Sequence, residues 1–436
     1  MIEQIIYRRG VQLIALICAA VSFVSFLITL PARAQTNQPP SGYVDLDNLN
    51  QEPITTTQPL TIYRPVVSKS EPVIPVQETR LFCNTPNTSI PDNNPSGTVS
   101  SYFSDISSYI VDLNVYADIS HTHPGDLSIF FYHQETGVST LLMDRPGYPA
   151  SSTGCGINDV VTIFDDQASL PVESKCTHTP IVSFAPGIGG RFLPETPLSV
   201  FHNESFWGNW TIQVIDENAL DTGRLEEWCI EVTLSNVATN PVVPPTMPPL
   251  PNYAFLGNLY GLPQALPLDC ESRSAVDWAA FFGKWINEFE FFNGLPKSDN
   301  PDIGFVGNVN GEWGQTPPQA YGVHAAPIAA RLRQYGLPAT AVRSFSWDEM
   351  RAEIAAGHPA EVWVIGAVKS GWPRYFRAND GKVTVVAPYE HTVVLTGYDL
   401  NNNQVWYLNG ANTYNTSIEQ FLDSWGVLGN MAIIYR

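Results

Sequence analysis

The segment Glu390-His-Thr-Val-Val-Leu-Thr-Gly-Tyr-Asp399 decides the fold of the C-terminal part of this 436-residue chain. It is an apolar run of strand length that begins close to a histidine, His391. Turn residues follow from Asp399 to Asn403, and Gln404 to Leu408 is predicted to be the returning strand. Because a hairpin places the end of its second strand beside the start of its first, we expect Asn409 to lie close to His391.

A single cysteine, Cys270, precedes this hairpin in the same part of the chain. After it, apolar residues recur at helical spacing and predict a buried amphipathic helix: Ala275, Trp278, Ala279, Phe282, Trp285, Ile286 and Phe289. The start of a helix stabilises a thiolate, which is the nucleophilic form of cysteine. A buried structural cysteine is the alternative.

Three histidines of the C-terminal part are candidate bases for this thiol. His358 follows a glycine and precedes a proline, so it is predicted to be a loop residue, and His324 is expected near a helix start. His391 is the preferred base, because an amide oxygen of Asn409 can orient its imidazole. The alternative for Asn409 is ordinary turn chemistry with Gly410.

The residues Gln264, Cys270, His391 and Asn409 together resemble the active-site constellation of papain-like cysteine peptidases. Gln264 stands six residues before Cys270, where its amide and the Cys270 backbone N–H can stabilise a tetrahedral oxyanion. Taken alone, Gln264 would be a loop residue. The resemblance implies four roles, which are nucleophile for Cys270, general base for His391, orienting residue for Asn409 and oxyanion donor for Gln264.

Within that fold, three segments resemble the bacteriocin-processing (double-glycine) peptidase-like family. They are Gly357-His-Pro-Ala-Glu-Val-Trp-Val364, Glu390–Asp399 and Ser417-Ile-Glu-Gln-Phe-Leu-Asp-Ser-Trp425. The similarity covers most of Leu256–Arg436. It implies that residues 252–436 form an α+β papain-like cysteine peptidase domain.

Two departures from the family pattern surround the thiol. The family usually shows Cys-Gly-Pro, whereas this chain has Cys270-Glu271-Ser272, and Asn409 stands where Asp is common. Asp269 precedes the cysteine, so carboxylates flank it on both sides. Negative neighbours raise a thiol pKa and oppose the effects of the helix start and of His391.

Residues 78–236 are predicted to be an all-β domain. Apolar and polar residues alternate from Leu113 to Ile119 and from Trp228 to Leu234, and turn clusters such as Asp221-Thr-Gly223 separate such runs. Several short strands at this spacing indicate a sandwich or a jelly roll.

Six segments of this domain, in order, resemble the P (Homo B) domain of proprotein convertases. They are Ile90-Pro-Asp92, His121–Leu127, Asn158-Asp159, Phe164–Asp166, Gly208–Thr211 and Gly223–Trp228. The resemblance implies a jelly-roll-like domain. In that family it follows and stabilises a subtilisin-type serine endopeptidase. This chain shows no Gly-Thr-Ser nucleophile segment, so the module is expected to serve another partner.

Cysteine usage agrees with an oxidising compartment. Cys83, Cys155, Cys176 and Cys229 fall in the predicted β domain and allow three disulfide connectivities. One of them joins Cys83 to Cys229, tying the first strand to the last, and Cys155 to Cys176, closing the intervening loop. Cys270 is then left as the odd thiol.

Two groups of residues in the β domain are candidate metal ligands. His121 and His123 share one strand face, but no third ligand is evident, so zinc is not expected. Five turn aspartates have the hard oxygens that calcium prefers: Asp126, Asp159, Asp165, Asp166 and Asp216. The alternative is that they cap turns, which is commoner. No cofactor is required by the predicted chemistry, and structural calcium is left open.

The first 34 residues are predicted to be a signal peptide. Two arginines precede the apolar run Val11–Leu30, and Pro31-Ala-Arg-Ala34 is typical of a cleavage site, with cleavage after Ala34. An uncleaved membrane anchor is the alternative. Residues 35–77 are expected to be a Pro-rich polar spacer and residues 237–251 a Pro-rich linker. The predicted location is extracellular, with cell-surface or wall association left open.

The net charge limits the classes of molecule that the protein is expected to bind. The chain has 22 Lys and Arg against 42 Asp and Glu, a net charge of −20. Such a surface disfavours nucleic acid and, after signal cleavage, anionic membranes. We expect a peptide or protein substrate instead.

Three functions fit these features. The favoured one is an exported cysteine endopeptidase with a Cys-His-Asn triad and an acyl-enzyme. The others are a non-catalytic surface binding protein with a degenerate peptidase-like domain, and an acyltransferase that uses the same triad. The sequence lacks a His-Glu-x-x-His helix, a phosphate-cradling glycine loop and a Cys-x-x-Cys pair.

Overall fold

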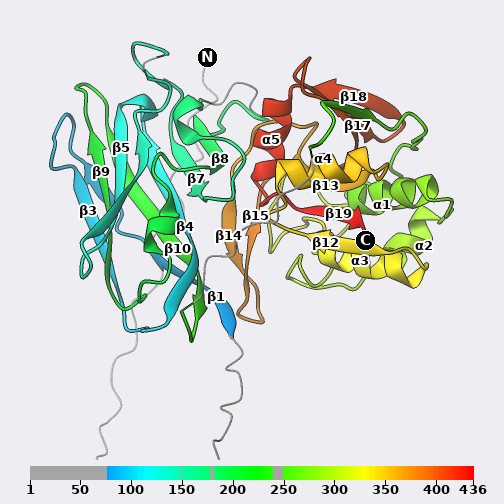
Figure 1. The fold of residues 1–436 in the computed structure, drawn as a ribbon, viewed down its shortest axis with the longest axis horizontal. Coiled ribbons are helices and arrows are strands. Elements are labelled where there is room, and N and C mark those ends of the chain that lie inside the picture. The colour runs from blue at the N-terminus through cyan, green and yellow to red at the C-terminus, as the bar shows by residue number, and fades with distance from the viewer. Residues whose placement is uncertain (1–75, 149, 177–180, 239–248) are drawn as a thin grey trace, which may run out of the picture. The chain divides into compact units, whose positions relative to one another are not determined.

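The computed structural model describes residues 76–148, 150–176, 181–238 and 249–436. The predicted signal peptide, almost all of the predicted spacer and residues 239–248 of the predicted Pro-rich linker lie outside these residues. The described elements belong to one compact unit, Glu71–Arg436. Strands predominate over helices in it, as the alternating sequence pattern predicted (Figure 1).

The first sheet is built around two long strands, β4 (Tyr109–His121) and β10 (Gly223–Ser235), which contain the predicted strands at 113–119 and 228–234. Its pairing is antiparallel except between the last two strands. The strand order is β1 (Gln77–Asn84), β10, β4, β7 (Val160–Phe164) and β8 (Ile188–Phe192), and β2 (Thr88–Ile90) also pairs with β10.

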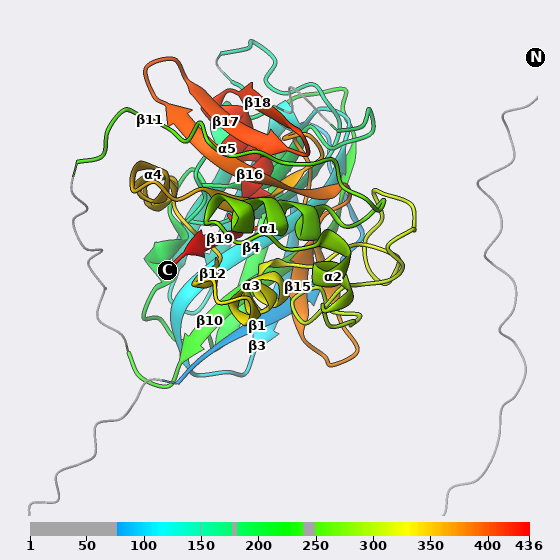
Figure 2. The same ribbon diagram turned by 90° about the vertical axis from the view of Figure 1, so that its right-hand side faces the viewer.

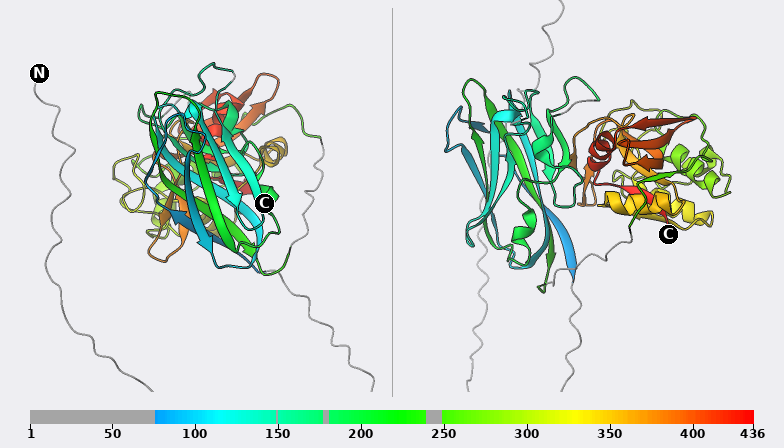
Figure 3. Two further views of the ribbon diagram at one scale, coloured as in Figure 1. Left: turned by 90° about the vertical axis from the view of Figure 1, so that its left-hand side faces the viewer. Right: turned by 45° about the horizontal axis from the view of Figure 1, so that its top comes forward.

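The second sheet packs against the first through a shared apolar core. Trp210 and Phe131 from this sheet and Trp228 from the first are fully buried, and the Phe131 ring contacts both tryptophans. Figures 1 and 3 show the two sheets as two layers. The strand order is β3 (Thr98–Ser104), β9 (Gly208–Asp216), β5 (Leu127–His133) and β6 (Val138–Asp144), and short 3-10 helices lie in the connections, η1 (Pro124–Asp126), η2 (Val172–Ser174) and η3 (Leu198–Phe201).

Two disulfides hold this β domain, with the connectivity that joins the first strand to the last. Cys83 on β1 faces Cys229 on β10 in the strand register, and the bond links residues 146 apart in the sequence. Cys155 bonds to Cys176, 21 residues away. Cys270 is a free, buried thiol.

The C-terminal sheet confirms the predicted hairpin. Its strands β16 (Glu390–Asp399) and β17 (Gln404–Asn409) pair antiparallel around the expected turn. The full order is β12 (Ala339–Val342), β19 (Ala432–Tyr435), β13 (Ala360–Ile365), β16, β17 and β18 (Asn412–Thr416), and β11 (Tyr253–Phe255) pairs with β16. A separate hairpin consists of β14 (Arg374–Arg377) and β15 (Val383–Val386).

Helices cover both faces of this sheet. On one face lie α1 (Cys270–Phe281) and α3 (Ala325–Gln334), which Figure 2 shows on the near side, and on the other lie α4 (Trp347–Ala355) and α5 (Ile418–Gly426). Strand β13 serves both cores, because its successive side chains point to opposite faces. Trp363 packs toward α1, and Val364 packs toward α5.

The prediction of one long helix after Cys270 is wrong, because this segment forms two helices. The first ends at Phe281, and Gly283 then adopts a left-handed conformation with φ of 78°, which glycine tolerates and which stops a helix. A new helix, α2 (Glu288–Asn293), starts after the N-cap Asn287. Trp285, expected on the buried face, lies between the helices with 83% of its surface exposed.

The β domain and the C-terminal sheet contact each other directly. The Lys175 Nζ lies 3.0 Å from the Glu419 Oε1 at the start of α5, and the Tyr116 and Tyr375 rings pack edge to face with centroids 5.5 Å apart. The apolar core beneath α1 extends to Tyr116 and Ile163 of the first sheet.

The two disulfides are expected to differ in their effect on stability. Replacing both Cys83 and Cys229 by Ser should lower the free energy of unfolding by about 5 kcal/mol, because that bond closes the longer loop of the unfolded chain, against about 3 kcal/mol for Cys155 and Cys176. Denaturant unfolding followed by tryptophan fluorescence measures both. A larger loss from the Cys155–Cys176 pair would contradict this order.

Candidate active site

The four sequence-predicted site residues line one cavity of about 330 Å³ in the C-terminal domain. Gln264 comes from the loop before α1, Cys270 from the first position of α1, His391 from β16 and Asn409 from the end of β17. The other residues that line it are Pro267, Leu268, Trp313, Tyr321, Gly366, Ala367 and Glu390.

Two close approaches hold these elements together. The Thr392 hydroxyl on β16 donates to the Ser274 Oγ on α1 at 3.0 Å. Gly261, at the start of the loop that carries Gln264, lies against the backbone oxygen of Gly410, and a Cβ at position 261 would collide with it. The first contact brings Cys270 to the His391 strand, and the second brings the loop to the Asn409 turn.

The sulfur of Cys270 lies in an acidic environment. Its side chain is nearly fully buried, and its thiol lies 3.4 Å from the Glu271 Oε2. Burial raises the pKa of the Cys270 thiol well above its usual range, and the carboxylates of Glu271 and Glu390 raise it further, while a hydrogen bond from the Thr392 backbone lowers it. These effects outweigh the stabilisation that the sequence pattern attributed to the helix start.

The imidazole of His391 is oriented as the hairpin predicted. Its Nε2 lies 3.0 Å from the Asn409 Oδ1. An amide oxygen only accepts, so Nε2 carries the proton and Nδ1 is the basic nitrogen of the neutral ring. Burial lowers the pKa of His391, and the Asn409 hydrogen bond acts against that lowering. The ring is therefore neutral near pH 7.

Gln264 lines the cavity, but its amide is engaged within its own loop. The Nε2 donates to the backbone oxygens of Leu266 at 2.8 Å and Pro267 at 3.0 Å. An amide has two hydrogens, so both are used in this conformation. To serve as an oxyanion donor, Gln264 must exchange one of these bonds.

Two buried glutamates complete the surroundings of the thiol. The Glu271 Oε1 accepts from the Val323 backbone at 2.6 Å, and burial raises the pKa of Glu271 to about 7. Burial and Glu271 raise the pKa of Glu390 above its ordinary value. Glu390 was missed from the sequence. The sequence could have indicated it, because Glu390 stands two residues before Thr392 and therefore lies on the same face of the strand, which packs against α1.

An aromatic wall was also missed. Trp313 lines the cavity with half of its surface exposed, its indole N–H donates to the Glu390 backbone oxygen at 3.1 Å, and its ring packs edge to face on Tyr389. Tyr321 lines the same cavity. Trp313 lies far from any predicted element in the sequence, so no local pattern pointed to it.

The other two histidines have structural roles. His324 is the N-cap residue of α3 and is fully buried, and its Nδ1 lies 2.6 Å from the Asp302 Oδ1. His358 lies between α4 and β13, as predicted, with its Nδ1 3.3 Å from the Glu353 Oε2. Neither residue lines the cavity.

Four of the five candidate calcium aspartates have backbone or ionic partners of the protein. Asp165 is paired with Arg191, and Asp166 accepts from the backbone N–H groups of Leu198 and Ser199 at the start of η3. Asp159 accepts from the His121 backbone, and Asp216 from its imidazole. The bonds from backbone N–H groups to Asp159 and Asp166 fit the turn-capping alternative, whereas Asp165 and Asp216 pair with other side chains.

The fifth aspartate, Asp126, accepts from the Asn218 side chain at 2.6 Å. In the part of the chain that the structure describes, it is the one member of the five in a group whose ligand atoms lie within 4.8 Å of one another, together with His123 and Asp221. The structure thus does not bring the five aspartates into one ligand set, and calcium binding stays a prediction.

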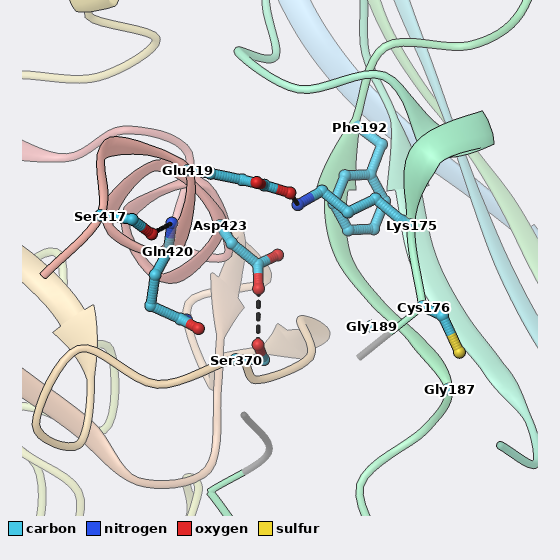
Figure 4. A pocket seen from close by; sticks show the side chains of 10 residues that line it. All are labelled: Lys175, Cys176, Gly187, Gly189, Phe192, Ser370, Ser417, Glu419, Gln420 and Asp423. Carbon is cyan, nitrogen blue, oxygen red and sulfur yellow. Dashed lines mark hydrogen bonds and ion pairs between the residues drawn. The ribbon is translucent and has the colours of Figure 1, made fainter. Parts of the chain in front are cut away.

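A second cavity, of about 250 Å³, lies between the β domain and α5 (Figure 4). Lys175 pairs there with Glu419, and the Ser370 hydroxyl donates to the Asp423 Oδ2 at 2.5 Å. Its one sulfur belongs to Cys176, which is in a disulfide, so this cavity offers no thiol nucleophile. The chemistry therefore points to the cavity at Cys270.

One comparison with known proteins, the family model, agrees with that choice. The model of the Peptidase_C39 like family matches residues 264–433, a segment that contains Gln264, Cys270, His391 and Asn409. No curated protein matches the sequence. Among solved structures, one described as a C39-like peptidase from Bacillus anthracis is 23% identical, with a TM-score of 0.37, over 42% of this chain and 97% of that chain.

The serine protease of Aeromonas sobria is 16% identical, with a TM-score of 0.21, over 37% of this chain and 27% of that chain. Its complex with the chaperone ORF2 is also 16% identical, with a TM-score of 0.23, over 38% of this chain and 28% of that chain. This chain thus covers little more than a quarter of those proteases. The family match makes the C-terminal region of this chain peptidase-like.

Proposed function

We propose that this protein is an exported cysteine peptidase whose active site is the Cys270 cavity. The observation that carries the proposal is that the hydrogen-bonded pair His391–Asn409 and a free thiol line the same cavity. A nucleophile, a base and a residue that orients the base are the parts that acyl transfer through a thioester needs. The match to the C39-like family over the same residues supports it.

The resting pair is a neutral thiol and a neutral imidazole, because the thiol pKa is raised and the imidazole pKa is lowered. Proton transfer therefore accompanies attack. The Cys270 sulfur bonds to the peptide carbonyl carbon while its proton moves to the His391 Nδ1. The C–N bond then breaks and the amine leaves with that proton. Water, deprotonated by His391, hydrolyses the thioester and restores the thiol.

The oxyanion of the tetrahedral intermediate is stabilised by donors at the start of α1. The Cys270 backbone N–H has no helical partner at this position. Gln264 supplies the second donor by exchanging its bond to Leu266 or Pro267 for one to the oxyanion.

A non-catalytic binding protein is the second candidate, and one observation favours it. Glu271 occupies the position after the cysteine where the resembled family has glycine. It accepts a hydrogen bond from the Cys270 thiol and raises the pKa of that thiol. A peptide that binds the cavity without being cleaved would be its ligand. An acyltransferase would use the same triad with an acceptor other than water.

We propose that the β domain is a jelly-roll-like P domain that serves as an accessory or recognition module. The six sequence segments and the two-sheet core support this assignment. Its direct contacts with α5 and with Tyr375 suit a module that supports the peptidase fold. In this chain, the C-terminal region takes the place of the subtilisin-type endopeptidase as the partner of the module.

We also propose that the protein acts outside the cell after cleavage at Ala34. The two disulfides suit an oxidising compartment. Within the described ranges, the helices are all too short or too polar to span a bilayer.

Cys270→Ala in the chain that starts at Gln35 should lower peptide hydrolysis by about 10³-fold or more, because the nucleophile is lost. Asn409→Ala should cost on the order of 10²-fold, because His391 loses its orientation. Mass spectrometry of a peptide library incubated with each chain measures both. His358→Ala is the matched control and should leave the rate unchanged. Hydrolysis that survives Cys270→Ala would refute the assignment, and an inactive parent chain would favour the binding protein.

The raised thiol pKa predicts slow alkylation of Cys270 by iodoacetamide at neutral pH, with a rate that rises only in the alkaline range. Glu271→Gln removes a negative neighbour, stabilises the thiolate and should lower the thiol pKa by about one unit, which speeds alkylation about tenfold at a fixed neutral pH. Peptide mass spectrometry in the presence of a chelator measures the rates. Fast neutral alkylation of the parent chain would instead show a preformed thiolate–imidazolium pair.

A further inference from the structure

Three potential ligand atoms converge at the floor of the active-site cavity. The Cys270 Sγ, one carboxylate oxygen of Glu271 and one of Glu390 all lie within 4.8 Å of one another. Cys270 and Glu271 are consecutive in the first turn of α1, and Glu390 is the first residue of β16. The bond between Ser274 and Thr392 fixes these two elements, so the convergence is built into the fold.

One oxygen of these three side chains lacks a hydrogen-bond partner among the described residues. Glu390 is 97% buried, since 3% of its surface is exposed, and within the described residues its Oε1 has no hydrogen-bond partner. The neighbouring Trp313 donates to the backbone oxygen of Glu390 and not to its carboxylate. A buried carboxylate oxygen without a partner is costly, and a bound cation removes that cost.

The basic side chain of α1 is paired with carboxylates outside this cluster. Arg273 is the one basic residue of the helix, and it is engaged by Asp277 and by Glu288, at 2.7 Å from the Glu288 Oε2. Gly322 leaves room for the two carboxylates, because a Cβ at position 322 would collide with the Glu271 Oε1 and lie 3.0 Å from the Glu390 Oε2. The acidic cluster is thus close-packed.

The donor set selects the class of metal. One thiolate sulfur and two carboxylate oxygens suit a borderline divalent cation such as Zn²⁺, whereas Ca²⁺ and Mg²⁺ take oxygen ligands only. Three protein ligands leave a fourth position, and Cys270 and Glu390 both face the cavity, where water can fill it.

We propose that Cys270, Glu271 and Glu390 form a binding site for Zn²⁺ or a similar divalent cation. On binding, the sulfur–metal bond replaces the S–H bond, and the thiol proton passes to solvent. No oxidation or reduction occurs. If the proposed peptidase function holds, the metal takes the nucleophile and reversibly switches hydrolysis off, since the same sulfur cannot serve both roles.

The test uses Co²⁺ as a spectroscopic substitute for Zn²⁺ on the metal-free chain that starts at Gln35. Binding should produce a thiolate-to-cobalt charge-transfer band, which one equivalent of Zn²⁺ removes. Cys270→Ala should abolish the band. Glu271→Gln and Glu390→Gln, which keep the side-chain shape, should each weaken Zn²⁺ binding, measured by calorimetry, by about tenfold or more.

Glu361→Gln is the matched control. Glu361 is fully buried on β13, neither carboxylate oxygen has a partner among the described residues, and it acts electrostatically on the same region, but it is outside the three-atom cluster. The affinity of the Glu361→Gln variant for Zn²⁺ should stay close to that of the parent chain. An equal loss in Glu361→Gln would mean that the acidic field alone attracts the metal and would overturn the site.

Absence of the band in the parent chain, or its survival in Cys270→Ala, would also overturn the proposal. These readouts do not depend on hydrolysis. Peptidase activity is measured separately in the presence of a chelator, so failure of the metal site and failure of the proposed function give different results.

Discussion

The packing of α1 against β16 is the contact on which the rest of the C-terminal domain depends. It places the first turn of a helix against the start of a strand, with the Ser274–Thr392 hydrogen bond inside the contact. Cys270 and His391 come from these two elements and line the same cavity only because of it. Trp278, from the middle of the helix, also ties α1 to the start of β13 by donating to the Pro359 backbone oxygen in the core.

That packing also creates an electrostatic conflict. It buries Cys270 with Glu271 and Glu390, and the low dielectric strengthens their mutual repulsion. The helix start favours a thiolate, but burial and two carboxylates act in the opposite direction. A thiol that keeps its proton reduces this repulsion, and a bound cation would reduce it by supplying positive charge. The same residues thus support acyl transfer in one state and metal binding in another.

The β domain has its own basis of stability and touches the peptidase-like region at specific points. Its two sheets close on an aromatic core around Trp210, and the Cys83–Cys229 bond joins its terminal strands. Lys175 and Tyr116 then reach α5 and the β14–β15 hairpin. The domain therefore contacts the C-terminal domain both at α5 and at the apolar core that lies beneath α1.

Local pattern determined the strands at 113–119 and 228–234, the hairpin after His391 and the Asn409 contact, because period-two alternation and turn residues act over a few neighbours. Local pattern did not predict the helix break at Gly283, since the sequence does not distinguish a glycine with left-handed backbone from any other glycine in an apolar run. Only tertiary structure decided that Glu390 and Trp313 join the cavity and that the thiol pKa rises. Those properties depend on which distant segments share a buried volume, and electrostatic energies in that volume depend on distance in space and not along the chain.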